Sequence, residues 1–229
     1  MRRNRSAGSP NDRFTPGRTA CLVLCLGAGV LALLTGCSST ETTTLPSTTA
    51  PADFSGYVQE PPRQVGSVSI TDVQGKPVSP VADPGGFRIV YFGYTTCPDV
   101  CPTTMSFVKS ALRNLPAADR DRIQVDMITI DPTRDTAAEF EEYLTAFIPD
   151  GRALRTEDQA LLRSTADAFG ANYEVTTNAE GEIEVSHSGD LFVVDDEGAI
   201  VLAWPFGVTP TAIENDLRRL LDGDRPTPA

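Results

Sequence analysis

The sequence contains little histidine, methionine, tryptophan or positive charge. Its 229 residues include one His, three Met and one Trp, and 19 basic side chains stand against 31 acidic ones. The net charge of −12 and the pI of about 4.5 argue against a nucleic-acid partner bound through a broad basic surface. No Ser-His-Asp order, phosphate-binding loop or dinucleotide-binding fingerprint is present, and the 40% hydrophobic content is that of a globular domain.

The hydrophobic run near the N-terminus is too short for an ordinary membrane-spanning helix. It covers residues 20–34, which is 15 residues, whereas a spanning helix needs roughly 20. Five Arg residues precede or border the run, and small residues follow it. This arrangement is typical of a secretory signal peptide, predicted here at residues 1–36.

The signal-like segment ends in Leu34-Thr-Gly-Cys37, which resembles the bacterial lipobox. In that motif the cysteine thiol receives diacylglycerol and becomes the new N-terminus. The resemblance implies that Cys37 anchors the protein to the cell membrane by lipid, with the domain on the extracytoplasmic side. The alternative is an uncleaved N-terminal anchor, which also places the domain outside the cytoplasm. Residues 37–56, rich in Ser, Thr and Pro, are predicted to be a disordered tether.

Residues 57–224 are predicted to form one α/β domain, followed by a short tail at 225–229. Alternating residues on both sides of Gln74-Gly75 predict a β-hairpin, and the apolar stretch 87–93 predicts a buried central strand. A helix with apolar residues at helical spacing follows. The other expected elements are a strand at 123–130, helices with capping boxes at Thr136 and Thr156, a hairpin across 178–181, strands at 190–195 and 199–204, and a helix from Thr209. This order is typical of an α/β sandwich.

Two cysteines stand where the apolar strand passes into this helix. The two signal-peptide cysteines would be removed and Cys37 would be blocked, so only Cys97 and Cys101 remain as thiols. Pro102 belongs in the first turn of the helix, which places Cys101 at the helix N-terminus and Cys97 in the preceding turn. The positive end of the helix dipole there favours thiolates. The spacing permits a redox disulfide, two ligands of one soft metal ion, or a structural disulfide or buried free pair.

The single histidine, His187, stands in a predicted loop before an apolar strand. A lone loop histidine is often a solvated bystander, but two thiolates and an imidazole form a trigonal ligand set for Cu(I) and a partial set for Cu(II). Structural zinc usually takes four protein ligands, and no third free Cys or second His is present. Met105 and Met127 fit core packing better than metal ligation. Asp131, at a strand end, is a secondary candidate that could equally serve a turn or a cap.

Three motifs together resemble the Sco/SenC family. They are Gly93-Tyr-Thr-Thr-Cys97-Pro-Asp-Val-Cys101-Pro, Ile128-Thr-Ile-Asp131-Pro-Thr-Arg-Asp135-Thr, and Val185-Ser-His187-Ser followed by Phe192-Val-Val-Asp-Asp-Glu-Gly198. The resemblance spans roughly residues 60–222 and implies a thioredoxin-like fold with an N-terminal hairpin and an inserted hairpin near the histidine. It also implies that Cys97, Cys101 and His187 bind copper. Thr96 replaces the His often found before the first Cys, which removes none of the three ligands.

The resemblance implies a copper chaperone that assists metallation of the binuclear copper centre in the copper-bearing subunit of cytochrome c oxidase. Two other functions stay open. One is a membrane-tethered thiol-disulfide reductase acting on the oxidase cysteines through the Cys97–Cys101 pair, and the other is a peroxidase-type antioxidant enzyme. Thioredoxin-like reductases carry a cis-proline facing the active cysteine, and no proline occurs between Pro149 and Pro205. The sequence therefore favours the chaperone over a general enzyme.

Overall fold

The structure, a computed structural model, describes residues 53–227. The predicted signal peptide, Cys37 and most of the predicted tether lie outside the described residues, and the predicted domain boundaries stay predictions. Within the described part, none of the helices has both the length and the apolarity needed to cross a membrane.

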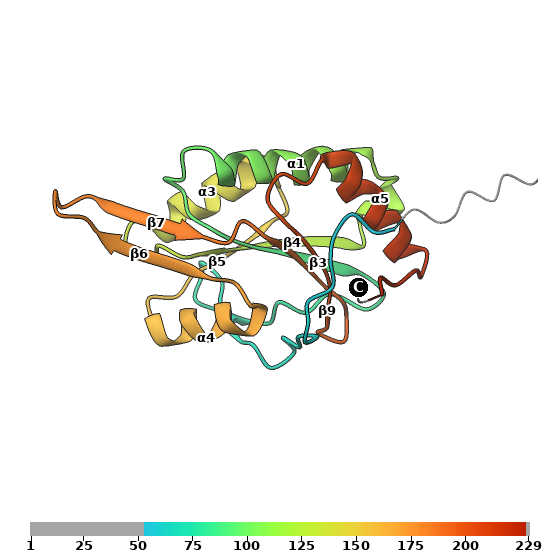
Figure 1. Ribbon diagram of the computed structural model, residues 1–229, viewed down its shortest axis with the longest axis horizontal. Helices are drawn as coiled ribbons and strands as arrows, with labels where there is room; N and C mark the ends of the chain where they lie inside the picture. Colours follow the sequence, from blue (N-terminus) through green and yellow to red (C-terminus); the bar gives the residue numbers. More distant parts are fainter. Residues whose placement is uncertain (1–52, 228–229) are drawn as a thin grey trace, which may run out of the picture. The chain divides into compact units, whose positions relative to one another are not determined.

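A five-stranded mixed sheet forms the middle layer of the described part (Figure 1). Its strands are β3 (Phe87–Gly93), β4 (Ile123–Thr129), β5 (Arg152–Leu154), β8 (Leu191–Val194) and β9 (Ile200–Trp204). Their order is β5-β4-β3-β8-β9, with β3, β4 and β5 parallel and β8 antiparallel to both of its neighbours. All seven residues of β3 are buried, as predicted for a central strand covered on both faces.

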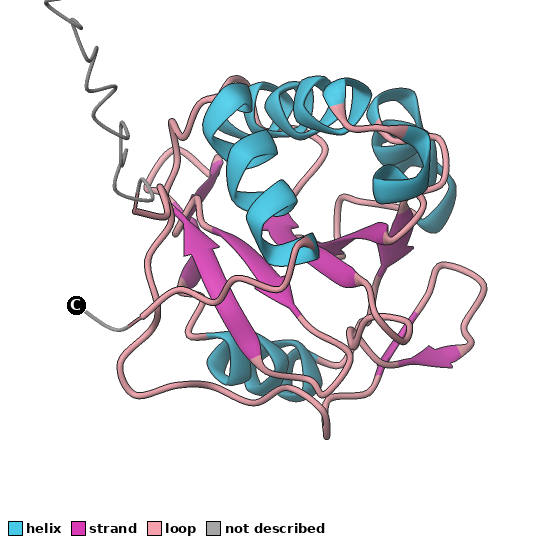
Figure 2. Ribbon diagram, turned by 90° about the vertical axis from the view of Figure 1, so that its right-hand side faces the viewer, coloured by secondary structure: helices cyan, strands magenta, loops and turns pink. Residues whose placement is uncertain are grey.

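Helices cover both faces of this sheet (Figures 1 and 2). One face is covered by α1 (Val100–Asn114), α3 (Ala137–Phe147) and α5 (Pro210–Leu221), and α4 (Gln159–Phe169) lies on the opposite face. A short helix, α2 (Ala117–Arg120), follows α1. The inward face of α1 carries Met105, Val108 and Leu112 at helical spacing, and all three are buried as predicted.

Two hairpins complete the fold. Strands β1 (Ile70–Thr71) and β2 (Pro77–Val78) pair antiparallel around a turn in which Gly75 has a φ of 81°. Strands β6 (Tyr173–Thr177) and β7 (Ile183–His187) form a second antiparallel pair, which projects from the body in Figure 1. The predicted α/β sandwich, with an N-terminal hairpin and an inserted hairpin near the histidine, is confirmed. His187 itself does not lie in the predicted loop: it is the last residue of β7, paired with Tyr173.

Helix α4 begins two residues later than the predicted cap. Its N-cap is Asp158, not Thr156, because the Asp158 carboxylate accepts hydrogen bonds from the amides of both Ala160 and Leu161. The Thr156 hydroxyl instead accepts from the Asp158 amide at 3.1 Å. The predicted cap at Thr136 is confirmed: its hydroxyl accepts from the Glu139 amide and donates to the Glu139 carboxylate at 2.7 Å. The sequence pattern does not predict α2 or β5, since four and three residues are too few to show a period.

The first described residues are fastened to the end of the fold by Asp216 in α5. Its buried carboxylate accepts hydrogen bonds from the amides of Ser55 and Gly56 at 3.0 Å and from the Trp204 indole at 2.8 Å. Tyr57 then forms an isolated antiparallel bridge with Ala203 of β9. The N-terminal segment therefore lies along β9, close to α5.

Candidate metal centre

The two cysteines lie at the junction between β3 and α1, as the proline argument predicts. Cys101 is the second residue of α1 and Pro102 the third, so the proline occupies the first turn, where no helical donor is lost. The Asp99 side chain makes no capping hydrogen bond. Instead, the Cys97 sulfur accepts a hydrogen bond from the Cys101 amide at 3.2 Å. Cys97 thus serves as the acceptor at the start of α1, and this contact brings the two residues together.

The end of β3 leaves no room for a side chain beside the Cys101 sulfur. A Cβ atom built on Gly93 would lie 3.1 Å from the Cys101 Sγ and 2.7 Å from atoms of both Tyr91 and Met127. Any larger residue at this position would have to displace one of these buried neighbours. Because Gly93 has no side chain, the start of α1 packs directly against β3, and this close contact keeps Cys101 buried.

Asp135 holds the loop that carries Cys97. Its carboxylate, wholly buried, accepts hydrogen bonds from the Thr95 amide at 3.1 Å and from the hydroxyls of Thr95 and Thr129 at 2.5 Å. Arg155 donates to the backbone carbonyl of Asp135 at 2.8 Å. Sequence reasoning assigns Asp135 no role, because it lies far from Cys97 along the chain. The sequence feature from which a role could be predicted is the position of Asp135, just after a strand end and directly before the N-cap of α3.

His187 reaches the cysteines from the last position of β7. Its Nδ1 donates a hydrogen bond to the Ser188 carbonyl at 2.9 Å, since a carbonyl can only accept. The Nε2 atom is then left with a free lone pair, and it lies 3.7 Å from the Cys101 Sγ. The rings of Tyr91 and Tyr94 each meet the imidazole edge to face, with centroids 6.0 Å away. These contacts fix the orientation in which His187 can act as a ligand.

Cys97, Cys101 and His187 form a cluster that can hold one metal ion. Their ligand atoms all lie within 4.8 Å of one another, and among residues 53–227 they are the one such group of three Cys, His, Asp or Glu side chains. An ion bonded to sulfur at about 2.3 Å and to nitrogen at about 2.0 Å, with an S–metal–N angle of about 120°, holds the sulfur and nitrogen atoms about 3.7 Å apart. The observed separation of Cys101 Sγ and His187 Nε2 is 3.7 Å. The donor set is soft and three-coordinate, which fits Cu(I) and leaves a structural zinc one ligand short.

Burial sets the protonation of the cluster when no metal is bound. It raises the pKa of the Cys101 thiol to about 12, although the hydrogen bond from the Tyr91 hydroxyl at 3.5 Å opposes this rise. The helix dipole favours the Cys101 thiolate, as predicted, but in the metal-free site burial outweighs the dipole and the thiol keeps its proton at neutral pH. Burial also lowers the pKa of His187, which keeps the imidazole neutral. A metal ion binding at this site has to displace the Cys101 proton, since the thiolate is the ligand.

The other candidate residues lie apart from this cluster. Asp131 is buried in an ion pair with Arg134, and it is not among the three side chains that converge. The structure therefore does not bring this secondary candidate to the ligands. Met105 and Met127 are wholly buried in the hydrophobic core, as their spacing predicts. Cys97 and Cys101 are both free thiols and both buried.

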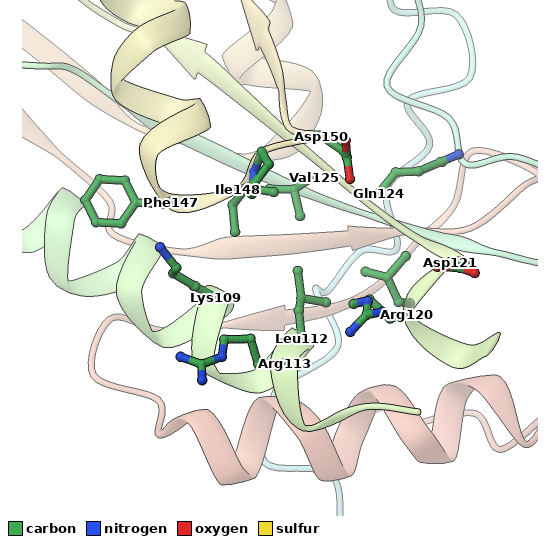
Figure 3. Close-up of a pocket in the computed structure, with 12 residues that line it drawn as sticks. Lys109, Leu112, Arg113, Arg120, Asp121, Gln124, Val125, Phe147, Ile148 and Asp150 are labelled. Carbon is green, nitrogen blue, oxygen red and sulfur yellow. The ribbon is translucent and has the colours of Figure 1, made fainter. Parts of the chain in front are cut away.

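A separate pocket of about 510 Å³ lies at the amino end of β4, away from the cysteines (Figure 3). It is lined by side chains of α1, the end of α3 and the start of β4, among them Leu112, Ile148 and Val125. None of its lining residues is a Cys or a His. The pocket therefore offers no soft metal ligand.

Comparison with known proteins places these residues in a family. A family model described as SCO1/SenC matches residues 58–222. A Stutzerimonas stutzeri protein named for copper binding is 31% identical over 163 residues, which cover 71% of this chain and 79% of that protein. For other curated relatives that match, the chain spans 39% to 66% of their length.

Solved structures agree with this match. The solution structure of apo Sco1 from Thermus thermophilus has a TM-score of 0.63 and 32% identity, and the likeness covers 75% of this chain and 99% of that one. The structure of Bradyrhizobium japonicum ScoI with copper bound has a TM-score of 0.56 and 28% identity, covering 69% and 96%. The predicted thioredoxin-like fold of these proteins is confirmed. Because the family model covers more than half of the chain, including Cys97, Cys101 and His187, the chain belongs to the SCO1/SenC family.

Proposed function

We propose that this protein carries copper on Cys97, Cys101 and His187 and assists metallation of the binuclear copper centre of cytochrome c oxidase. The observation that carries the proposal is the convergence of the three ligand atoms within 4.8 Å. Family membership supports it, since the Bradyrhizobium japonicum relative was solved with copper bound. The copper-bearing subunit of the oxidase is the proposed recipient.

Copper is the metal that this donor set favours. Two thiolates and one imidazole prefer a soft ion, and three ligands complete the trigonal arrangement of Cu(I). The rings of Tyr91 and Tyr94 contact His187, and both cysteines are buried.

We also propose a lipid anchor at Cys37, with the copper domain on the extracytoplasmic side of the cell membrane. The support is the lipobox-like Leu34-Thr-Gly-Cys37 that follows a short apolar run. A tether of 15 residues, 38–52, joins this cysteine to the first described residue, Asp53. A flexible chain of that length averages roughly 20 to 25 Å end to end, enough to hold the domain clear of the lipid headgroups.

In a second candidate function, the thiols of Cys97 and Cys101 reduce a disulfide between the cysteines of the oxidase. It is supported by two free thiols held together at a helix start. In this reaction the Cys97 and Cys101 thiols give two electrons and two protons to a partner disulfide. They become a disulfide themselves, and the partner gains two thiols. Oxidation would remove both thiolate ligands, so the reduced form is the one that carries copper.

Copper titration tests the proposed function. Protein purified from membranes under reducing conditions should bind one Cu(I) per chain, and the oxidised protein should show a Cys97–Cys101 bond by mass spectrometry and bind none. A Cys97→Ser variant that still holds one tightly bound copper would place the site elsewhere. Cells lacking the protein should have a copper-deficient oxidase that added copper partly restores, whereas peroxide sensitivity with a normal oxidase would indicate the antioxidant function.

A further inference from the structure

Large apolar side chains are exposed at few places in the described part of the chain, and these places lie on the hairpin that ends at His187 and beside the segment that follows it. Four such side chains are more than a third exposed: Tyr57, Val175, Ile183 and Phe206, at 42%, 39%, 40% and 48%. They come from three segments far apart in the sequence. Single exposed apolar residues are normal, but a gathering of them around one site marks an interaction surface.

Val175 and Ile183 lie on the face of the β6–β7 hairpin that carries His187. The register pairs Tyr173 with His187, Val175 with Val185, and Thr177 with Ile183. Side chains alternate between the two faces of a strand, and paired residues share a face. Tyr173 and Val185 pack against the core, whereas Val175 and Ile183 continue the same face outward, where the hairpin projects in Figure 1.

The base of the hairpin is held firmly, so this face has a defined position. The Arg163 guanidinium of α4 lies 3.8 Å from the centroid of the Tyr173 ring and donates to the Tyr173 carbonyl at 3.0 Å. The Ser188 amide donates to the Asn172 carbonyl at 2.8 Å. A hollow of about 350 Å³ at this base is lined by residues 172–174 and 186–188, including His187. His187 is therefore the ligand nearest to a surface that a partner could reach.

Phe206 and Tyr57 lie beside the segment that follows His187. A Cβ atom built on Gly189 would come within 2.8 Å of the Phe206 Cβ and 3.5 Å of Val100, the residue before Cys101. The Tyr57 hydroxyl is hydrogen-bonded to the carboxylate of Asp190. Both aromatic side chains thus flank the backbone two or three residues beyond His187.

The charge near these side chains is of one sign. Residues 164–217 include no Lys or Arg, and the turn of the hairpin and the segment after His187 carry Glu180, Glu182 and Asp190. Glu174 and Glu184 lie on the other face of the hairpin. Asp99 is exposed next to α1. The nearby cations are already engaged: Arg163 on Tyr173, and Arg134 in its ion pair with Asp131. A partner that fits here presents basic side chains around an apolar centre.

We propose that Tyr57, Val175, Ile183 and Phe206 form the docking surface for the protein that accepts copper from this site. The proposal rests on the proposed function. Copper passes between proteins by ligand exchange without a change of oxidation state, so the acceptor has to bring its own soft ligands to the cluster. Cys101 is wholly buried and Cys97 is 8% exposed, which leaves the His187 side as the approach. The acceptor is thus a protein with an apolar, Lys- or Arg-edged surface around soft copper ligands.

The test compares copper transfer to a protein with transfer to a small molecule. The Val175→Ser/Ile183→Ser variant is loaded with Cu(I) and mixed either with the purified copper-bearing domain of the cell's own cytochrome c oxidase or with bathocuproine disulfonate. Transfer to the oxidase domain should slow by about tenfold, the usual effect of removing central apolar contacts. Removal by the chelator, which needs no docking surface, should be unchanged. Thr176→Ala, an exposed position on the other face of the hairpin, serves as the matched control.

Each outcome distinguishes this inference from the function on which it rests. If the unaltered protein delivers no copper to the oxidase domain, both the function and the surface are wrong. If it delivers copper and the double variant does so at the same rate, the surface alone is wrong. Phe206→Ser should repeat the slow transfer. Raising the salt concentration should slow transfer to the oxidase domain, because it screens the attraction between the acidic residues here and a basic partner edge.

Discussion

The two regions that supply the metal ligands differ in burial, rigidity and access. The β3–α1 junction, with Cys97 and Cys101, lies in the hydrophobic core. The β6–β7 hairpin pairs only with itself, most of its strand positions are exposed, and its last residue is His187. One site is thus built from a region that belongs to the core and a region that projects from it (Figure 1).

This difference assigns separate tasks to the two regions. The buried junction holds both sulfur atoms in place before a metal arrives, because its loop is fixed by Asp135 and by the start of α1. Beyond its fixed base the hairpin has few buried positions, and such segments open at low free-energy cost. A carrier must bind a soft metal tightly and also release it. In the proposed carrier, the two thiolates bind the metal tightly, and a partner protein approaches the metal from the His187 side.

The largest expected effect concerns the buried thiol. Burial raises the pKa of Cys101 from 9.0 to about 12, and only the thiolate reacts with iodoacetamide. At pH 8, metal-free reduced protein should therefore alkylate Cys101 roughly a thousandfold more slowly than urea-unfolded protein does. The rate should rise about tenfold per pH unit from pH 9 to 11 in the folded protein and level off in the unfolded one. Fragment-ion mass spectrometry measures the alkylation at each cysteine.

The same pKa difference predicts how stability depends on pH. Between pH 9 and 12 the unfolded thiol ionises while the folded one keeps its proton, so the metal-free protein loses stability as the pH rises. A Cys101→Ala variant should lose this part of the pH dependence, as followed by urea unfolding. Equal alkylation rates for folded and unfolded Cys101 would contradict a buried junction.

The next effect concerns the thiol ligands. Cys97→Ser or Cys101→Ser should lower Cu(I) affinity by more than about a hundredfold, since loss of a partner that only supports a ligand already changes affinity 10- to 100-fold. Competition with a chromophoric Cu(I) chelator measures the change. Met105→Leu, a substitution in the hydrophobic core one turn after Cys101 in α1, should leave the affinity unaltered. If either serine variant matches the unaltered protein, the junction is not the metal site.

A smaller effect on Cu(I) is expected from the hairpin ligand. His187→Ala should weaken Cu(I) by about tenfold, because two thiolates alone can still bind Cu(I), and should weaken Cu(II) more, since Cu(II) prefers nitrogen ligands. The visible spectrum of the Cu(II) form should change at the same time. If the spectrum and the affinity are unchanged, His187 is not a ligand, and the hairpin contributes nothing to the metal site.

The smallest effect tests what holds the junction. Asp135→Asn keeps one acceptor oxygen but leaves one of the three donors from Thr95 and Thr129 without a partner. The free energy of unfolding should fall by about 1–3 kcal/mol, and urea denaturation measures it. Asp121→Asn, at an exposed position, should have no effect. If Asp135→Asn is equally stable, the loop is held by other contacts.

Local patterns predict the elements that carry the site. The apolar run 87–93 becomes β3 and Pro102 fixes the start of α1, because both effects act within a few residues. The turn at 178–181 likewise predicts the second hairpin, but the prediction leaves His187 in a loop, whereas it pairs with Tyr173 at the end of β7. The prediction misses β5, a three-residue strand defined by pairing with β4 rather than by its own pattern. It also misplaces the cap of α4, where Asp158 competes successfully with Thr156.

Local chemistry and spacing predict the ligand types, their order and the strand-to-helix junction that carries both cysteines. The tertiary structure was needed to show that His187 ends a paired strand, that Asp135 supports the Cys97 loop, and that Asp131 stays apart with Arg134. It was also needed to show that burial raises the pKa of the Cys101 thiol, and that the exposed apolar side chains lie on the hairpin that ends at His187 and beside the segment that follows it. The physical reason is that burial and long-range hydrogen bonding depend on which distant segments the sheet brings together, and no local pattern records them.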